Sequence, residues 1–137
     1  MNTYAKSRMP TVLVVDDEPS ICQLACEVLS ELDLRVLTAH DGYEALHVLK
    51  HDREHVTLAL LDYSLPGMDC ETLIHELQKI DRQIKVVVST GATGKLFENP
   101  VALGIDAMIP KPYSIRQLAD LVLSLVQGDD SATETNG

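Results

Sequence analysis

Short apolar runs and helix-like patterns alternate along the chain. The apolar runs are rich in β-branched residues, which is typical of buried strands. They cover residues 12–15, 35–39, 56–61, 84–88 and 105–109, with the second and fifth weaker than the others. Strands separated by helical segments predict an α/β fold, because right-handed crossovers then produce a parallel sheet with helices on both faces.

The helical segments are recognised by apolar residues three and four positions apart. The first begins near Pro19, which suits a first helical turn, the second follows the Asp41-Gly42 turn signal, and the third follows Gly67. Their predicted core residues are Ile21, Leu24, Ala25, Val28, Leu29 and Leu32; Ala45, Leu46 and Leu49; and Leu73, Ile74 and Leu77.

The sequence predicts the last helix much more clearly than the helix before it. Pro100 falls where the fourth helix is expected, so that helix should be broken or restart there. The last helix spans about residues 114–127 and ends at Gly128. Its predicted core positions are Ile115, Leu118, Ala119, Val122 and Val126, which leaves Leu121 as an exposed apolar residue.

The 137 residues fit one domain, because domains most often contain roughly 100–150 residues. We place it at residues 10–128, after an N-terminal extension (1–9) and before a polar, disordered tail (129–137). The net charge of −10 argues against direct nucleic-acid binding, since a phosphate backbone would be repelled. The three cysteines lack the spacing of a disulfide framework. The sequence has neither an apolar stretch long enough for a membrane helix nor the apolar region of a signal peptide, so we expect a cytoplasmic protein.

Polar or charged residues follow the predicted strands at the point where each one ends. The first strand is followed by Asp16, Asp17 and Glu18, the third by Asp62, the fourth by Ser89 and Thr90, and the fifth by Lys111. In an open parallel sheet the functional crevice lies beyond the carboxyl ends of the strands, so these groups should share one edge. Helix capping alone would explain one acid, but not three acids together with a lysine.

The predicted edge has the chemistry of a metal-assisted phosphoryl-transfer site. Carboxylates without His or Cys ligands favour a hard cation such as Mg²⁺, which would offset the mutual repulsion of Asp16, Asp17 and Asp62. Lys111 would bind a phosphoryl oxygen as a point charge, and the Thr90 hydroxyl would donate to another. Asp62 stands alone on its strand, so we expect it to be the nucleophile that forms an acyl phosphate.

Four motifs, VVDDEP, LLDYSLPGMD, STG and PKPY, occur in an order that resembles the receiver domain of two-component response regulators. The resemblance covers residues 10–128 and implies a flavodoxin-like (βα)5 fold, with a doubly wound five-stranded parallel sheet of order 2-1-3-4-5. It implies a phosphoryl group accepted from a sensor histidine kinase or a histidine phosphotransfer protein. It further implies a switch that acts on a downstream effector protein, with a phosphorylation-dependent dimer as one option, and not an enzyme with an external substrate.

The resemblance also assigns roles to residues of the acidic site. Asp62 would be the phosphoryl acceptor, Asp17 a direct Mg²⁺ ligand, and Asp16 an acid of the metal site that acts through water, with Mn²⁺ as an alternative ion. The backbone carbonyl of Ser64 would be a further ligand. Glu18 is expected to cap the helix that Pro19 begins.

Two further roles concern the opposite side of the site. Lys111 would contact the phosphate, and the bond between Lys111 and Pro112 is expected to be cis. Thr90, which precedes Gly91, would be the switch hydroxyl, with Ser89 as the alternative. Phosphorylation would then change the surface formed by the fourth helix, the fifth strand and the last helix, although Met108 stands where receivers often carry an aromatic residue.

Other interpretations fit parts of the pattern. A Mg²⁺-dependent phosphohydrolase with an aspartyl-phosphate intermediate would place a second acid two residues after the nucleophile, where this chain has Ser64. A receiver-like interaction module that works without phosphate is suggested by Met108 and by the expected break in the fourth helix. His47, His51 and His55 have a spacing that could bind a transition metal, but they lie off the apolar face of their helix, so we interpret them as solvated.

Overall fold

The computed structural model describes residues 9–51, 56–91 and 100–127. Its five strands form one parallel sheet of order β2-β1-β3-β4-β5, which confirms the predicted flavodoxin-like α/β fold. The predicted tail, and the predicted extension except for Met9, lie outside the described residues. The strands are β1 (Thr11–Val15), β2 (Arg35–Ala39), β3 (Val56–Asp62), β4 (Lys85–Thr90) and β5 (Ala107–Pro110).

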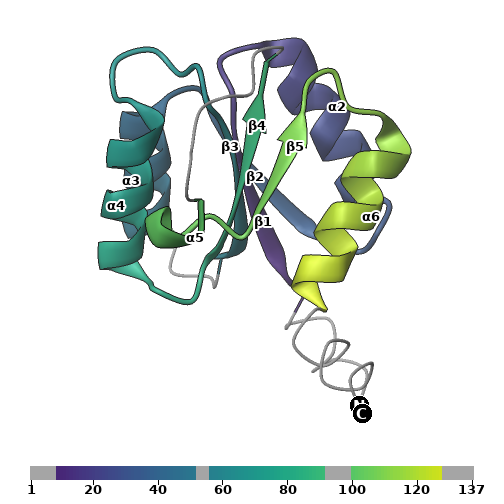
Figure 1. The fold of residues 1–137 in the computed structure, drawn as a ribbon. Coiled ribbons are helices and arrows are strands. Elements are labelled where there is room, and N and C mark those ends of the chain that lie inside the picture. The colour runs from purple at the N-terminus through teal and green to yellow at the C-terminus, as the bar shows by residue number, and fades with distance from the viewer. Residues whose placement is uncertain (1–8, 52–55, 92–99, 128–137) are drawn as a thin grey trace.

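Helices cover both faces of the sheet (Figure 1). On one face lie α2 (Pro19–Ser30) and α6 (Ile115–Val126), and on the other lie α3 (Gly42–His51) and α4 (Cys70–Ile80), with the short α5 (Pro100–Leu103) beside α4. None of the helices within the described ranges has the length and apolar character required to cross a bilayer.

The sheet separates two hydrophobic cores, and the central strands contribute to both. In β1, Leu13 and Val15 belong to the core under α3 and α4, whereas Val12 and Val14 belong to the core under α2 and α6. Successive side chains of a strand point to opposite faces, so a strand covered on both sides must be apolar at every position. This explains why the run VLVV is continuous and does not alternate with polar residues.

Local signals fix where the helices begin. The side chain of Asp69 accepts a hydrogen bond from the backbone N–H of Thr72 and so caps α4. Ser114 and Gln117 form a reciprocal capping box at the start of α6. Pro19 occupies the first turn of α2, as predicted. These caps set the lengths of the loops that carry the polar residues at the carboxyl ends of the strands.

The last helix differs from the prediction at two residues, Ile115 and Leu121. Ile115, expected in the core, is 58% exposed, because it lies in the first turn of α6, directly after the capping residue Ser114. Leu121, expected to be exposed, is partly buried and packs against the core under α2 and α6. The other predicted core residues are confirmed, because Leu118 and Val122 are buried and Ala119 and Val126 pack against the same core.

The fourth helical segment agrees with the proline signal. α5 begins at Pro100 and contains four residues. Residues 92–99 lie outside the described part of the chain, so only the restart at Pro100 is described. Met108, at the position where receivers often carry an aromatic residue, is partly buried in β5 and packs against the core under α3 and α4.

The histidines of α3 are solvated as predicted where the structure describes them. His47 and His51 are exposed, with ring centroids 4.0 Å apart, and His51 Nδ1 lies 2.9 Å from the backbone carbonyl oxygen of His47. His55 lies outside the described residues.

Candidate functional site

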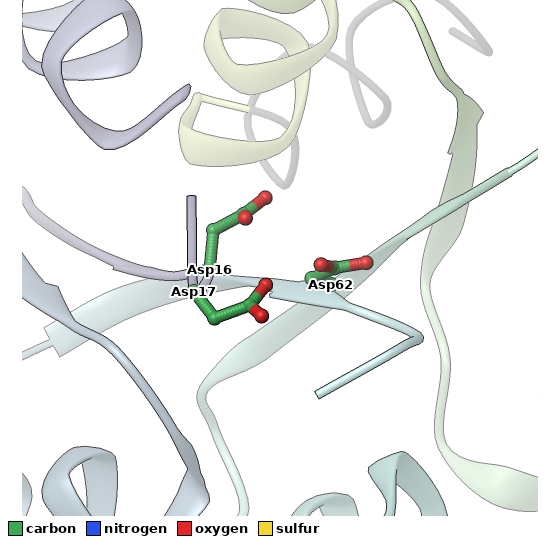
Figure 2. A group of neighbouring side chains, drawn as sticks. All are labelled: Asp16, Asp17 and Asp62. Carbon is green, nitrogen blue, oxygen red and sulfur yellow. The ribbon is translucent and has the colours of Figure 1, made fainter. Parts of the chain in front are cut away.

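Three carboxylates lie together at the carboxyl edge of the sheet (Figure 2). Asp16 and Asp17 follow β1, and Asp62 is the last residue of the neighbouring strand β3. One oxygen atom from each of the three side chains lies within 4.8 Å of the other two. Asp16 and Asp62 are buried, whereas Asp17 is exposed. The structure thus brings together the three acids that the strand ends predicted.

Lys111 completes this cluster from the end of β5. Its Nζ lies 2.9 Å from Oδ2 of Asp16 and 3.3 Å from Oδ2 of Asp62. The peptide bond that follows it, to Pro112, is cis, as expected. One lysine therefore contacts both buried carboxylates, and together with Asp17 the group retains excess negative charge.

The two buried carboxylates are held in the same manner. Oδ1 of Asp16 accepts a hydrogen bond from the backbone N–H of Glu18 at 3.0 Å, and Oδ1 of Asp62 accepts one from Ser64 at 3.1 Å. Each donor lies two residues beyond its acceptor. Because the other oxygen of each carboxylate faces Lys111, both side chains have a fixed orientation while lone pairs remain for further ligands.

Burial and charge act in opposite directions on these groups. Burial raises the pKa of Asp16 above its ordinary value of 3.8, while the Glu18 N–H and Lys111 reduce this effect and the charge of Asp62 adds to it. Burial alone would lower the pKa of Lys111, but its hydrogen bond with Asp16 and the charges of Asp16 and Asp62 prevail and raise it. Lys111 is therefore a cation at neutral pH.

The donor set fits a hard divalent cation. The three groups that come within 4.8 Å of one another offer only carboxylate oxygen atoms, which suit Mg²⁺ or Mn²⁺ better than softer metals. The exposure of Asp17 leaves the cluster accessible from solvent. The cluster can therefore accept a cation and, beside it, the oxygens of a phosphoryl group.

The two candidate hydroxyls differ in their surroundings. Ser89 pairs with Asp62 in the sheet, and its hydroxyl donates to the backbone carbonyl of Leu61 across a long 3.5 Å separation. Thr90 is the last residue of β4, and its carbonyl accepts a hydrogen bond from the backbone N–H of Lys111 at 2.7 Å. Both side chains are buried at the carboxyl edge. Thr90 is thus joined directly to the segment that carries the lysine.

Glu18 differs from its predicted role. It occupies the N-cap position of α2, but its side chain makes no capping hydrogen bond. Its Oε1 instead lies 3.6 Å from Nζ of Lys111, and its backbone N–H binds Asp16. Glu18 therefore begins α2 through its backbone, while its side chain lies near Lys111 and does not cap the helix.

One buried residue near the site was not singled out from the sequence. Tyr113 follows the cis bond and packs into the core under α2 and α6. Burial raises its pKa to about 12, with a further contribution from the charge of Asp16. The phenol of Tyr113 is therefore neutral at physiological pH, close enough to Asp16 and Lys111 for their charges to affect its pKa. Its place directly after Lys111 and Pro112 in the PKPY motif could have indicated that it lies near the site.

Comparisons with known proteins agree with this arrangement. A family model described as the response regulator receiver domain matches residues 12–123. Sporulation initiation phosphotransferase F of Bacillus subtilis is 32% identical over 113 residues, which cover 81% of this chain and 89% of that protein. A probable transcriptional regulator, ycf27 of Cyanophora paradoxa, is 35% identical over 92% of this chain and 54% of its own length.

Longer relatives and a solved structure complete the comparison. The chain spans about half the length of the ycf27 relatives, and a sensor kinase of Brucella abortus, CckA, is matched over 13% of its length. The response regulator TrrA of Thermotoga maritima, solved in complex with Mg²⁺-BeF, has a TM-score of 0.74 and 29% identity, covering 85% of this chain and 99% of that one. The chain belongs to the response regulator receiver domain family of two-component signalling systems.

Proposed function

We propose that Asp62 is the phosphoryl acceptor of this receiver domain. The supporting observation is the position of its carboxylate, which contacts Lys111 through Oδ2 and lies in the cluster with Asp16 and Asp17. Asp62 alone among the three acids comes from β3, so it faces the Asp16-Asp17 pair across the strand boundary. Its Oδ1 is bound by the Ser64 N–H, which fixes the direction of the nucleophile.

The donor is proposed to be a phosphohistidine of a sensor kinase or phosphotransfer protein. A carboxylate oxygen of Asp62 attacks phosphorus, the new P–O bond forms an acyl phosphate, and the P–N bond breaks so that the imidazole leaves with its electron pair. The match to part of a sensor kinase supports a partner of this class.

Asp16, Asp17, Asp62 and the backbone carbonyl of Ser64 would hold Mg²⁺. The bound ion supplies positive charge that offsets the repulsion between these carboxylates and the incoming phosphoryl oxygens. Asp17 presents an exposed carboxylate, whereas the Oδ2 atom of Asp16 is engaged by Lys111. This difference supports direct ligation by Asp17 and a supporting role, through water, for Asp16.

Lys111 and Thr90 would act on the phosphorylated state. Lys111 already contacts Oδ2 of Asp62, so its ammonium group is placed to bind an oxygen of a phosphoryl group on that residue. The backbone hydrogen bond from Lys111 to Thr90 couples the end of β4 to the segment that follows β5. Recruitment of the Thr90 hydroxyl would shift the surface of α5, β5 and α6 between two states and so control an effector protein.

Acetyl phosphate with Mg²⁺ provides the direct test. Intact-mass spectrometry should show a gain of one phosphoryl group on the wild type and no gain on Asp62→Asn. Asp33→Asn is a matched control, because Asp33 is exposed, lies outside the site, and has a positive φ of 62° that asparagine tolerates. Labelling that persists in Asp62→Asn would refute the assignment.

A further inference from the structure

The loop that follows the proposed acceptor is covered by an aromatic side chain from another element. Tyr43 is the second residue of α3, and Gly67 lies in the loop between β3 and α4. A Cβ atom added to Gly67 would lie 3.2 Å from Cε2 and 3.8 Å from Cδ2 of Tyr43. Gly67 also has a φ of +82°, which favours glycine. The ring therefore packs on a backbone that no side chain shields.

A second contact joins the same two segments. A Cβ atom added to Gly42, the first residue of α3, would lie 2.9 Å from Sδ and 3.1 Å from Cβ of Met68. Met68 also packs against the core under α3 and α4. The first turn of α3 and the β3–α4 loop thus approach each other at two consecutive positions, and a glycine on one side permits each approach.

The loop held in this way carries the backbone of Ser64. At its start, the Ser64 N–H binds Asp62, and at its end Asp69 caps α4. Leu65 is buried in the core under α3 and α4, whereas Pro66 and Gly67 are exposed. The loop is therefore fixed from below by Leu65, and Tyr43 supplies a contact from the solvent side.

The exposure of Tyr43 argues against a role in the core. Its side chain is 63% exposed, and neither core cluster contains it. A large aromatic residue that remains mostly in water contributes little to core stability. The approach of its ring to Gly67 therefore points to a role outside the core.

We propose that Tyr43 is a positioning residue for the acidic site, whose ring braces the β3–α4 loop through Gly67 and so holds the Ser64 backbone against Asp62. This inference deepens the proposed function, since Ser64 is the proposed carbonyl ligand of Mg²⁺. The ring acts through van der Waals contact, so Tyr43→Phe should preserve the brace and Tyr43→Ala should remove it.

The brace is tested first on the metal-free protein, without phosphoryl transfer. Amide hydrogen exchange by NMR should be faster at Ser64 in Tyr43→Ala than in the wild type, and unchanged in Tyr43→Phe. Ile80→Ala is the matched control, because Ile80 is an exposed apolar residue in the last turn of α4. Exchange at Ser64 that is the same in Tyr43→Ala and the wild type would overturn the proposal, whether or not the protein binds Mg²⁺.

A Mg²⁺ titration followed by amide chemical shifts tests the consequence for the site. Tyr43→Ala should bind Mg²⁺ roughly tenfold more weakly, the lower end of the effect of removing outer-shell partners. Tyr43→Phe and Ile80→Ala should match the wild type, and equal loss in the two Tyr43 variants would overturn the ring contact as the cause. Failure of the wild type itself to bind Mg²⁺ would refute the proposed metal site. The exchange experiment would still show whether the Tyr43 ring holds the Ser64 backbone.

Discussion

Lys111 and Asp16 form a hydrogen-bonded ion pair although 95 positions separate them in sequence, with Nζ 2.9 Å from Oδ2. The lysine side chain is 18% exposed and the aspartate side chain 3%. This pair joins the loop after the first strand to the loop after the last one. Because the pair is largely removed from water, the two charges depend strongly on each other.

Removal of the Lys111 side chain should make the stability of the protein depend more strongly on Mg²⁺. In EDTA, Lys111→Ala should lower the free energy of unfolding by about 1–3 kcal/mol, because Asp16 and Asp62 lose their shared cation. Saturating Mg²⁺ should stabilise this variant more than the wild type, since the ion replaces the missing charge. Urea unfolding with and without Mg²⁺ measures both effects.

Lys79→Ala is the control for this experiment. Lys79 pairs with Glu76 on the exposed surface of α4, so its loss should change stability by less than about 1 kcal/mol and leave the Mg²⁺ effect unaltered. Equal stabilisation of Lys111→Ala and the wild type by Mg²⁺ would show that the ion and the lysine do not act on the same carboxylates.

Neutralising the exposed acid should have the opposite effect on the metal-free protein. Asp17→Asn removes one of three clustered negative charges, so the free energy of unfolding in EDTA should rise by about 1 kcal/mol, the Coulomb energy of two charges 4 Å apart in water. The stabilisation by Mg²⁺ should then largely disappear. Thermal unfolding of Asp17→Asn beside Asp33→Asn tests this, and full retention of the Mg²⁺ effect would exclude Asp17 as a ligand.

The pKa of Asp16 predicts an unusual dependence of stability on pH. Burial raises this pKa above 3.8, so in the metal-free protein the folded state holds the proton more tightly than the unfolded chain does. The contribution of Asp16 to the free energy of unfolding should therefore fall as pH rises from 3.8 through the raised pKa, and stay constant above it.

Urea unfolding across acidic pH gives the free energy of unfolding of the wild type and of Asp16→Asn. The difference between these two free energies isolates the contribution of Asp16. With saturating Mg²⁺ the slope should reverse, because the ion binds the ionised carboxylate and competes with the proton. A difference that rises with pH in EDTA would mean that the attraction of Lys111 outweighs the cost of burial.

Substitutions that preserve side-chain shape can distinguish the roles of the adjacent Ser89 and Thr90 hydroxyls. Thr90→Val should accept a phosphoryl group on Asp62 normally but lose the amide shift changes in β5 and α6 that follow phosphorylation, because only the hydroxyl is removed. Ser89→Ala should keep both labelling and shift changes, since the Ser89 hydroxyl donates to Leu61. NMR spectra of the two phosphorylated variants decide the matter, and the reverse pattern would assign the switch to Ser89.

The acidic site could be predicted from the sequence because it depends on where strands end. Asp16, Asp17, Asp62 and Lys111 each follow an apolar run, and parallel strands place their carboxyl ends at one edge whatever the details of packing. The strand order β2-β1-β3-β4-β5 came from the family resemblance, because periodicity alone does not say which strands are neighbours.

The errors concern residues whose environment depends on three-dimensional packing. In α6, Ile115 directly follows the cap Ser114 and is exposed, whereas Leu121 is partly buried against the core. Glu18 has the sequence position of a helix cap, yet the approach of Lys111 from the far end of the chain attracts its side chain. A local pattern contains no information about a partner so distant in sequence.

The ion pair between Lys111 and Asp16 has a consequence during synthesis. A growing chain that has emerged only as far as Asp62 contains all three acids but neither β5 nor the lysine that follows it. The three acids follow β1 and end β3, but their ion pairs with Lys111 can form only when the last strand joins the sheet. A newly made molecule should therefore have the lysine beside its three acids only after β5 has been made and has entered the sheet.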